Sequence, residues 1–404
     1  MAEPAANGFE QLAATCAAAG PDAMFDELAA SLAASGRWHA VFDARLAQAR
    51  LALGLSATGG TEQLEPAVRD RLEDRTLAAC REVGWPLLEA GRVREAWMYL
   101  RAAAEPAEVA ARLARLAAAT AATADDDDDA ARRLEEIVAV ALWEGVDPAL
   151  GIGLVLRRQG TCNAITAFEQ AVAGLPASRQ EAAAAALVAH LHGELAARLA
   201  ADLADRGLAA GAADGSVVAL LDSAGGLRDD PAVHVDVSHL HAVLRFARVC
   251  RDEPTIRRAW ELARYAARLP AEFIQPGEPP FADAMASQAF FGAQLGRDVE
   301  PALDRFRRAA EAGDAEAGPL PRDTLVLLLW RLGRPGEALR AALAHQPRED
   351  DLPRARLPAG LLPSLVDLAA AANEWDTLRQ ACRDRGDEVT FAATLAAERH
   401  QRAG

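Results

Sequence analysis

The sequence predicts an all-α protein built from antiparallel helical hairpins. Hydrophobic residues, with alanine by far the commonest, make up 51% of the 404 positions, whereas tyrosine occurs twice and phenylalanine eleven times. Alanine has the highest helix propensity of the amino acids, while strands favour aromatic and β-branched residues. A chain of this length exceeds the size at which a single hydrophobic core stops growing, so we expect several domains or an array of repeats.

A recurring glycine-arginine pair marks the predicted turns between helices. It occurs at Gly36-Arg37, Gly91-Arg92, Gly296-Arg297 and Gly333-Arg334, each time after one apolar helical stretch and before another. Glycine adopts the left-handed backbone conformation that a tight turn between helices needs. The pairs therefore predict the corners of helical hairpins.

Two of these segments are similar over about twenty residues, a length that spans several helical turns at the 3.6-residue period of a helix. They read LLEAGRVREAWMYLRAAAEP (87–106) and LWRLGRPGEALRAALAHQP (329–347), and both contain Glu-Ala after the glycine and end in proline: Glu95-Ala96 and Pro106, Glu337-Ala338 and Pro347. The pattern resembles the second half of a tetratricopeptide repeat, where a small alanine lets two helices approach and proline ends the second helix. Weaker copies align through Trp38 and Trp375. The resemblance implies a degenerate α-solenoid, irregular in the middle.

We divide the chain into N-terminal hairpins at 1–120, a central helical region at 121–230 and C-terminal hairpins at 231–404. The central region contains an acidic run, Asp125 to Asp129, which we interpret as a solvated loop that favours the N-terminus of the next helix. Loose binding of a divalent cation is the alternative. The apolar stretch 134–156, with Trp143, predicts a helix pair buried on most sides.

The C-terminal region opens with a predicted hairpin. The apolar residues Leu240, Val243, Leu244 and Ala247 have helical spacing, Asp236 or Ser238 would cap this first helix, and a second helix follows the break at Glu253-Pro254 and runs from Ile256 to Leu269. Proline-rich connections at 269–281 and 346–363 are too rich in proline for helix.

Potential metal ligands lie at the start of this hairpin. Period-two alternation would place His234 and Asp236 on one side of an extended segment, and His239 and His241 follow in the first turns of the helix. Imidazole and carboxylate suit a divalent transition metal such as zinc, iron or manganese. The alternative is that Asp236 caps the helix and the histidines are polar loop and surface residues.

A second group of potential ligands lies in the helix around LVAHLHGELAARL. His190 and Glu194 are four residues apart and share one helical face, so they would complete a metal site with the first group. His192 points about 200° away from His190 at ~100° per residue, so the two cannot bind the same ion. The alternative is a solvated face on which Glu194 pairs with Arg198.

Cys162 is a candidate nucleophile. Gly160 is expected to end one helix and Thr161 or Asn163 to cap the next, which places Cys162 at a helix N-terminus, where the dipole favours a thiolate. Catalysis would also need a nearby base such as His190. The alternative is a buried structural cysteine.

Charge and composition exclude several classes of function. The formal net charge is −16 and the arginines are dispersed among acids, so we expect no nucleic-acid partner and no membrane binding. All 43 basic residues are arginine, which excludes a P-loop site, a Schiff base to pyridoxal phosphate and kinase chemistry. Five scattered cysteines, together with no apolar run long enough for a membrane span and no signal peptide, indicate a cytoplasmic protein.

Two functions fit these observations. The first is a scaffold that binds another protein or a peptide through a concave surface of the stacked hairpins. Its candidate anchors are Trp97, Tyr99, Trp260, Tyr265, Trp330 and Trp375. The alternative is a metal-dependent hydrolase or oxygenase, in which the hairpins enclose a site built from the His234 group, His190, Glu194 and Cys162.

Overall fold

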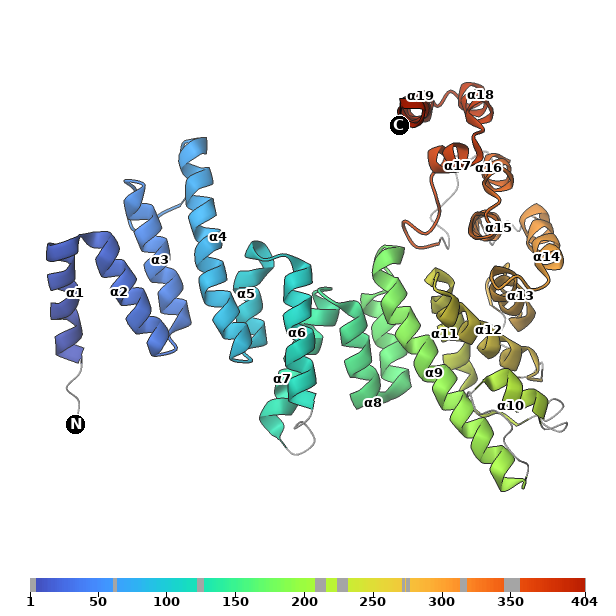
Figure 1. Cartoon of the computed structure of the whole chain (residues 1–404), viewed down its shortest axis with the longest axis horizontal. Coiled ribbons are helices and arrows are strands. Elements are labelled where there is room, and N and C mark those ends of the chain that lie inside the picture. The colour runs from blue at the N-terminus through green and yellow to red at the C-terminus, as the bar shows by residue number, and fades with distance from the viewer. Residues whose placement is uncertain are drawn as a thin grey trace. The chain divides into compact units, whose positions relative to one another are not determined.

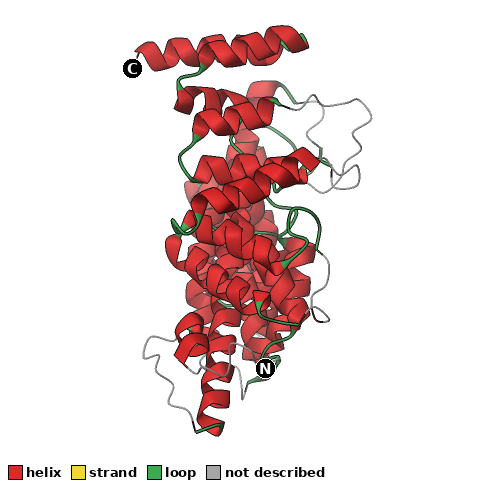
Figure 2. Ribbon diagram, turned by 90° about the vertical axis from the view of Figure 1, so that its right-hand side faces the viewer, coloured by secondary structure: helices red, strands yellow, loops and turns green. Residues whose placement is uncertain are grey.

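The computed structural model of the chain describes residues 5–60, 64–121, 127–207, 216–223, 232–270, 273, 277–312, 318–344 and 357–403. Within these ranges the regular structure consists of nineteen α-helices and short π- and 3₁₀-helical segments, without a strand (Figure 1, Figure 2). The all-α class predicted from the alanine-rich composition is confirmed. No helix in the described ranges is long and apolar enough to cross a membrane.

The chain forms two compact units, residues 1–151 and 152–404. The first unit contains α1 (Ala5–Ala19), α2 (Pro21–Ala34), α3 (Trp38–Ala52), α4 (Pro66–Glu89), α5 (Val93–Ala103), α6 (Pro106–Ala121), α7 (Asp128–Val138) and the π-helical segment η1 (Ala139–Trp143). Each of α1 to α4 packs against the helix that follows it, α6 packs on α7, and α5 contacts α7 and η1. The predicted boundaries at residues 120 and 230 stay predictions.

The second unit begins within α8 (Pro148–Ala171) and continues through α9 (Ala177–Asp205), α10 (Val217–Ser223), α11 (Val237–Phe246), η2 (Ala247–Val249), α12 (Glu253–Ala267), α13 (Ala284–Gln294), α14 (Val299–Ala312), α15 (Leu320–Arg331), α16 (Pro335–Leu343), α17 (Leu365–Ala372), α18 (Trp375–Arg385) and α19 (Glu388–Ala403). The long helix α9 contacts α10, α11, η2 and α12, and from α11 onward successive α-helices pack against each other. The two helices predicted for this segment are present as α11 and α12 and contact each other.

The four glycine-arginine pairs form one kind of turn. The φ angles of Gly36, Gly91, Gly296 and Gly333 are 68°, 77°, 74° and 69°, in the left-handed region. At each corner the glycine N–H donates to the carbonyl three residues earlier, and the arginine N–H donates to the carbonyl five residues earlier. Asn373-Glu374 and Gly386-Asp387 close α17 and α18 with the same two hydrogen bonds. The predicted corners are therefore confirmed, because a left-handed residue satisfies the last carbonyls of each preceding helix.

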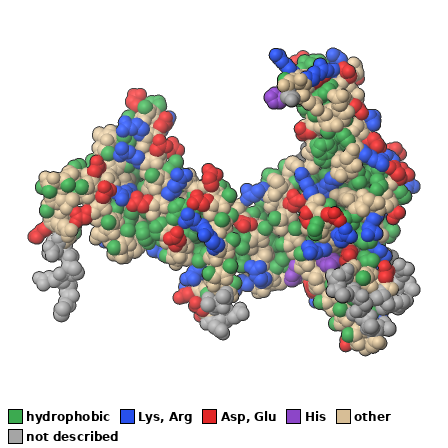
Figure 3. All heavy atoms as spheres, in the orientation of Figure 1, with side chains coloured by type: hydrophobic (Ala, Val, Ile, Leu, Met, Phe, Trp, Pro, Cys, Tyr) green, Lys and Arg blue, Asp and Glu red, His purple; other side chains and the backbone are tan. Residues whose placement is uncertain are grey.

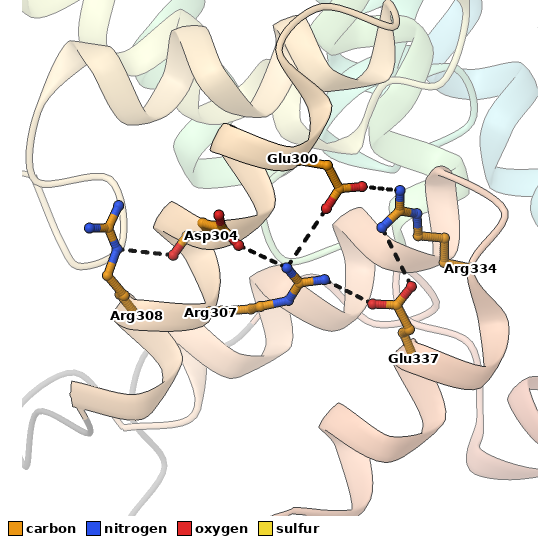
Figure 4. A network of polar contacts seen from close by, with 6 residues as sticks. All are labelled: Glu300, Asp304, Arg307, Arg308, Arg334 and Glu337. Carbon is orange, nitrogen blue, oxygen red and sulfur yellow. Dashed lines mark hydrogen bonds and ion pairs between the residues drawn. The ribbon is translucent and has the colours of Figure 1, made fainter.

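The corner before α16 is tied to the preceding helices by ion pairs (Figure 4). Glu337 accepts hydrogen bonds from Arg334 of its own corner (3.4 Å) and from Arg307 of α14 (2.9 Å). Arg334 also pairs with Glu300, and Arg307 with Asp304 at 2.9 Å. The network therefore links α16 to α14, the helix two positions earlier in the chain.

Glu95 has the equivalent place in the first unit. It accepts a hydrogen bond from Arg92 of its corner (2.8 Å), and its other oxygen lies 2.8 Å from Nε2 of His39 on α3, again two helices earlier. The alanines that follow the two glutamates, Ala96 and Ala338, are completely buried. Exposed ion pairs stabilise a fold by less than about 1 kcal/mol, so these links set geometry more than stability.

The structure of the middle of the chain agrees only in part with the prediction from the sequence. Asp125 and Asp126 lie outside the described residues, while Asp127 caps α7 by accepting from the backbone N–H of Asp129. The acidic run thus favours a helix N-terminus, as the sequence indicated. In the apolar stretch 134–156, Trp143 is 54% exposed, so this side chain does not contribute to a buried pair.

Candidate functional site

His234 is buried and bonded to residues outside the predicted ligand group. Its Nε2 lies 3.1 Å from Oδ2 of Asp202, and its Nδ1 lies 3.2 Å from the hydroxyl of Tyr265 and 3.3 Å from the guanidinium of Arg268. Its backbone N–H donates to the same tyrosine hydroxyl at 2.7 Å. The hydrogen bonds from His234 and Arg206 hold the pKa of Asp202 below its usual value. Both ring nitrogens of His234 thus have partners within the protein.

Asp236 caps α11, which is one of the two alternatives predicted from the sequence. Its Oδ1 accepts from the hydroxyl of Ser238 (2.5 Å), from the backbone N–H of Ser238 (2.8 Å) and from that of His239 (3.4 Å). The hydroxyl contributes most to lowering the pKa of Asp236. His241 lies one turn further along α11, where burial lowers the pKa of its imidazole.

His190 and Glu194 share one face of α9, as predicted, with Nε2 and Oε2 4.0 Å apart. Glu194 accepts from Arg198 at 2.6 Å, which is the pairing expected for a solvated face. Arg198 also donates to the backbone carbonyl of His234 at 3.0 Å. The two predicted ligand groups are therefore neighbours, joined by an arginine and a backbone carbonyl.

Cys162 follows a break in α8 at Gly160, whose φ of 82° and ψ of 179° are not helical. The predicted helix start is thus present. The alternative of a buried structural cysteine is wrong, because the Cys162 side chain is exposed. The candidate base His190 lies next to this helix start, but its Nε2 contacts the hydroxyl of Thr161 at 3.1 Å and makes no hydrogen bond with Cys162.

No three His, Cys, Asp or Glu side chains in the described ranges are grouped so that they could hold a metal ion. A structural zinc site needs four ligands and a catalytic one three. The metal site predicted from the sequence stays a prediction, and so does its zinc, iron or manganese ion. Its candidate ligands are His234, Asp236, His239, His241, His190 and Glu194.

A different pair of ionisable groups is buried between α9 and α12. Nε2 of His192 lies 2.8 Å from Oε2 of Glu261, and the two side chains are 13% and 9% exposed. The carboxylate also accepts from the hydroxyl of Ser216 (3.0 Å) and from the backbone N–H of Val217 (2.8 Å). Burial raises the pKa of Glu261, but the three hydrogen bonds together lower it further, so the net pKa lies below its usual value.

This pair forms part of the lining of a cavity of about 480 Å³ within the second unit. The cavity lies along α12, with contributions from α9, the start of α10 and the corner before α14. Four arginines and a tryptophan line it beside the pair: Arg257, Arg258, Arg264, Arg297 and Trp260. Cavities of roughly 300–1,000 Å³ hold small ligands in other proteins.

No protein-family model, curated protein or solved structure matches this chain. Function is therefore inferred from its own residues, since a fold class alone does not define an activity. The features that support such an inference are the recurring corners and the arginine-lined cavity.

Trp260 holds two of the arginines in place. The guanidinium carbons of Arg297 and Arg264 lie 4.2 Å and 5.2 Å from the centre of its ring. The indole itself packs against Gly292 of α13, where an added Cβ would lie 3.1 Å from the indole nitrogen. Stacking on an aromatic ring restricts a guanidinium and leaves its N–H groups available to a ligand.

The cavity contains residues that the sequence alone did not single out. The sequence predicted that His190 and His192 point in different directions. It did not indicate Glu261 as the partner of His192, because Glu261 is 69 residues away in the chain. One signal was present in the sequence: Glu261 follows Trp260 directly in a helix whose other buried residues are mostly apolar. An acid at a buried position of a helix needs hydrogen-bond partners, so it marks a polar contact within the core.

Proposed function

We propose that the chain is a helical-repeat scaffold that binds another protein or a peptide through the concave surface of stacked, tetratricopeptide-like hairpins. The recurring corner carries the proposal. In the described residues its backbone hydrogen bonds are found at seven places, the six named above and Gly54-Leu55 at the end of α3, and a glutamate after two of the corners reaches a basic residue two helices earlier. Repeats of this kind build extended surfaces whose main use in proteins is to bind partners.

The packing of the helices is consistent with this proposal. Within each unit most contacts join helices that follow each other in the chain, as expected where each repeat packs on its neighbours. On the face drawn in Figure 3, acidic and basic side chains are interspersed in both units, which suits contact with a polar protein surface.

The candidate anchors fall into two classes. Trp260, Tyr265 and Trp375 are buried, whereas Trp97, Tyr99 and Trp330 are partly exposed. The buried three serve internal packing, and the partly exposed three remain able to contact a partner.

Photo-crosslinking tests the proposal. A photoreactive phenylalanine analogue placed at Trp330 in cells is expected to capture a partner, which is then purified and titrated with the full chain. We expect Trp330→Ala to weaken that purified interaction at least about tenfold, as for an interface hot spot. The matched control, Leu395→Ala, shortens an exposed apolar side chain on α19 and is expected to leave affinity unchanged. A captured protein that does not bind the purified chain, or binds both variants equally, would contradict the proposal.

A further inference from the structure

The cavity along α12 contains arginines whose charges are balanced to different degrees. Arg257 pairs with Glu253 of the same helix at 2.5 Å, and Arg264 lies 3.9 Å from Asp222 of α10. His192 and Glu261 satisfy each other. Both of these arginines thus have a carboxylate partner within the protein, and the Glu261 carboxylate has its hydrogen-bond partners there.

Arg258 and Arg297 differ from them. Neither forms an ion pair or a hydrogen bond with a carboxylate in the described parts of the chain, and the ring of Trp260 is the contact that positions Arg297. Both side chains are exposed, so their guanidiniums can reach a bound molecule. Two unbalanced positive charges line one cavity of a protein whose net charge is −16.

We propose that this cavity binds a phosphate monoester. At neutral pH such a group carries a charge of about −1.5 to −2 and three acceptor oxygens, which matches two guanidiniums. A single carboxylate would leave one of the two charges unbalanced. The inference does not rest on the scaffold proposal, because it uses only the side chains of this cavity.

The cavity also has room for the group that carries the phosphate. Its volume of about 480 Å³ far exceeds the ~30 Å³ that one water molecule occupies in the liquid. Trp260, Pro254 and Val218 supply apolar surface beside the arginines. The ligand is thus a phosphorylated organic group, either a small molecule or a phosphorylated side chain of another protein.

Calorimetric titration of the full chain with phenyl phosphate tests the inference. We expect saturable one-to-one binding, and we expect the double variant R258Q/R297Q to bind at least about tenfold more weakly, since each charged hydrogen bond contributes roughly that factor. The matched control R308Q/R399Q removes two exposed arginines that do not line the cavity and is expected to bind within about twofold of the wild type. Thermal unfolding of both variants verifies that they are folded.

Benzoate keeps the aromatic ring and replaces the phosphate by a carboxylate. Binding of benzoate as tight as that of phenyl phosphate would overturn the inference, and so would unchanged affinity of R258Q/R297Q or no saturation of the wild type up to about 10 mM ligand. A phosphoserine peptide identifies the source of the phosphate. Binding of that peptide more than about tenfold tighter than phenyl phosphate assigns the group to a partner protein, and any weaker binding of the peptide assigns it to a small molecule.

Discussion

Replacing Glu261 by glutamine tests whether the buried pair holds α10 against α12. The carboxylate of Glu261 receives hydrogen bonds from His192, Ser216 and the backbone N–H of Val217, at 2.8, 3.0 and 2.8 Å. Glutamine keeps the shape of the side chain and one acceptor oxygen, but it removes the charge and presents an NH₂ group to N–H donors.

The expected cost follows from burial. The Glu261 side chain is 9% exposed, so water cannot replace the lost partners. Removing one member of a buried ion pair costs about 3–5 kcal/mol, and the acceptor that glutamine retains reduces this to roughly 2–4 kcal/mol. Glu253 on the same helix is the control, because its side chain is 70% exposed and its ion pair is with Arg257. Glu253→Gln is expected to cost at most about 0.5 kcal/mol.

Hydrogen exchange measured by mass spectrometry resolves this effect locally. We expect Glu261→Gln to raise the exchange rate of α10 about tenfold or more, because the amide of Val217 loses a charged acceptor. Glu253→Gln is expected to leave that rate unchanged. Equal protection of α10 in both variants would refute the role given to Glu261.

The effect should also depend on pH. The pKa of Glu261 in the folded protein lies below its usual value of 4.5, so the unfolded chain binds the proton more readily. The stabilisation is therefore complete above pH 4.5 and is lost as the pH falls through the folded pKa. The difference between wild type and Glu261→Gln should shrink accordingly in acid.

Three further predictions concern the corners, two partly buried arginines and metal content. Gly333→Ala places a side chain at a φ of 69° and should destabilise the second unit by about 1 kcal/mol, whereas Gly193→Ala, in open space within α9, should stabilise it by about 0.5–1 kcal/mol in chemical denaturation. Arg331→Met should lower the free energy of unfolding by about 2 kcal/mol more than Arg248→Met does. Arg331 donates to Gln294 and to two backbone carbonyls, whereas Arg248 lies over the ring of Phe281. Equal melting temperatures of the two variants would contradict this. Elemental analysis should find less than about a tenth of an equivalent of zinc, iron or manganese after reconstitution, and stoichiometric metal would favour the enzyme alternative.

Local features of the fold could be predicted from the sequence. The corners follow from glycine, because few other residues adopt positive φ without strain. The cap at Asp236 follows from its short carboxylate, which reaches the first N–H groups of α11. Both depend on neighbours a few residues away.

Features that depend on distant contacts could not be predicted. The predicted alternation before α11 does not appear in the burial pattern, because His234 and Val235 are both buried, the first against Tyr265, whereas Asp236 is exposed. The pairing of His192 with Glu261 joins helices that are far apart in sequence, and the residues around each of the two do not indicate the other as its partner. No pattern in the sequence indicates that Arg258 and Arg297 line one cavity.

We expect the helices of the second unit to be stabilised mainly by their neighbours along the chain. Hydrogen exchange of a chain that ends at Ala344 tests this directly, because removing α17, α18 and α19 takes away the packing of α17 on α16. The truncation also removes Ala359, whose carbonyl accepts the backbone N–H of Ala177 at the start of α9 at 2.8 Å. We predict that protection is lost at Ala177 and in α16, and that the rest of α9 to α15 keeps the protection of the full chain. Loss of protection throughout the second unit would show that the unit folds as one cooperative globule and would contradict the account.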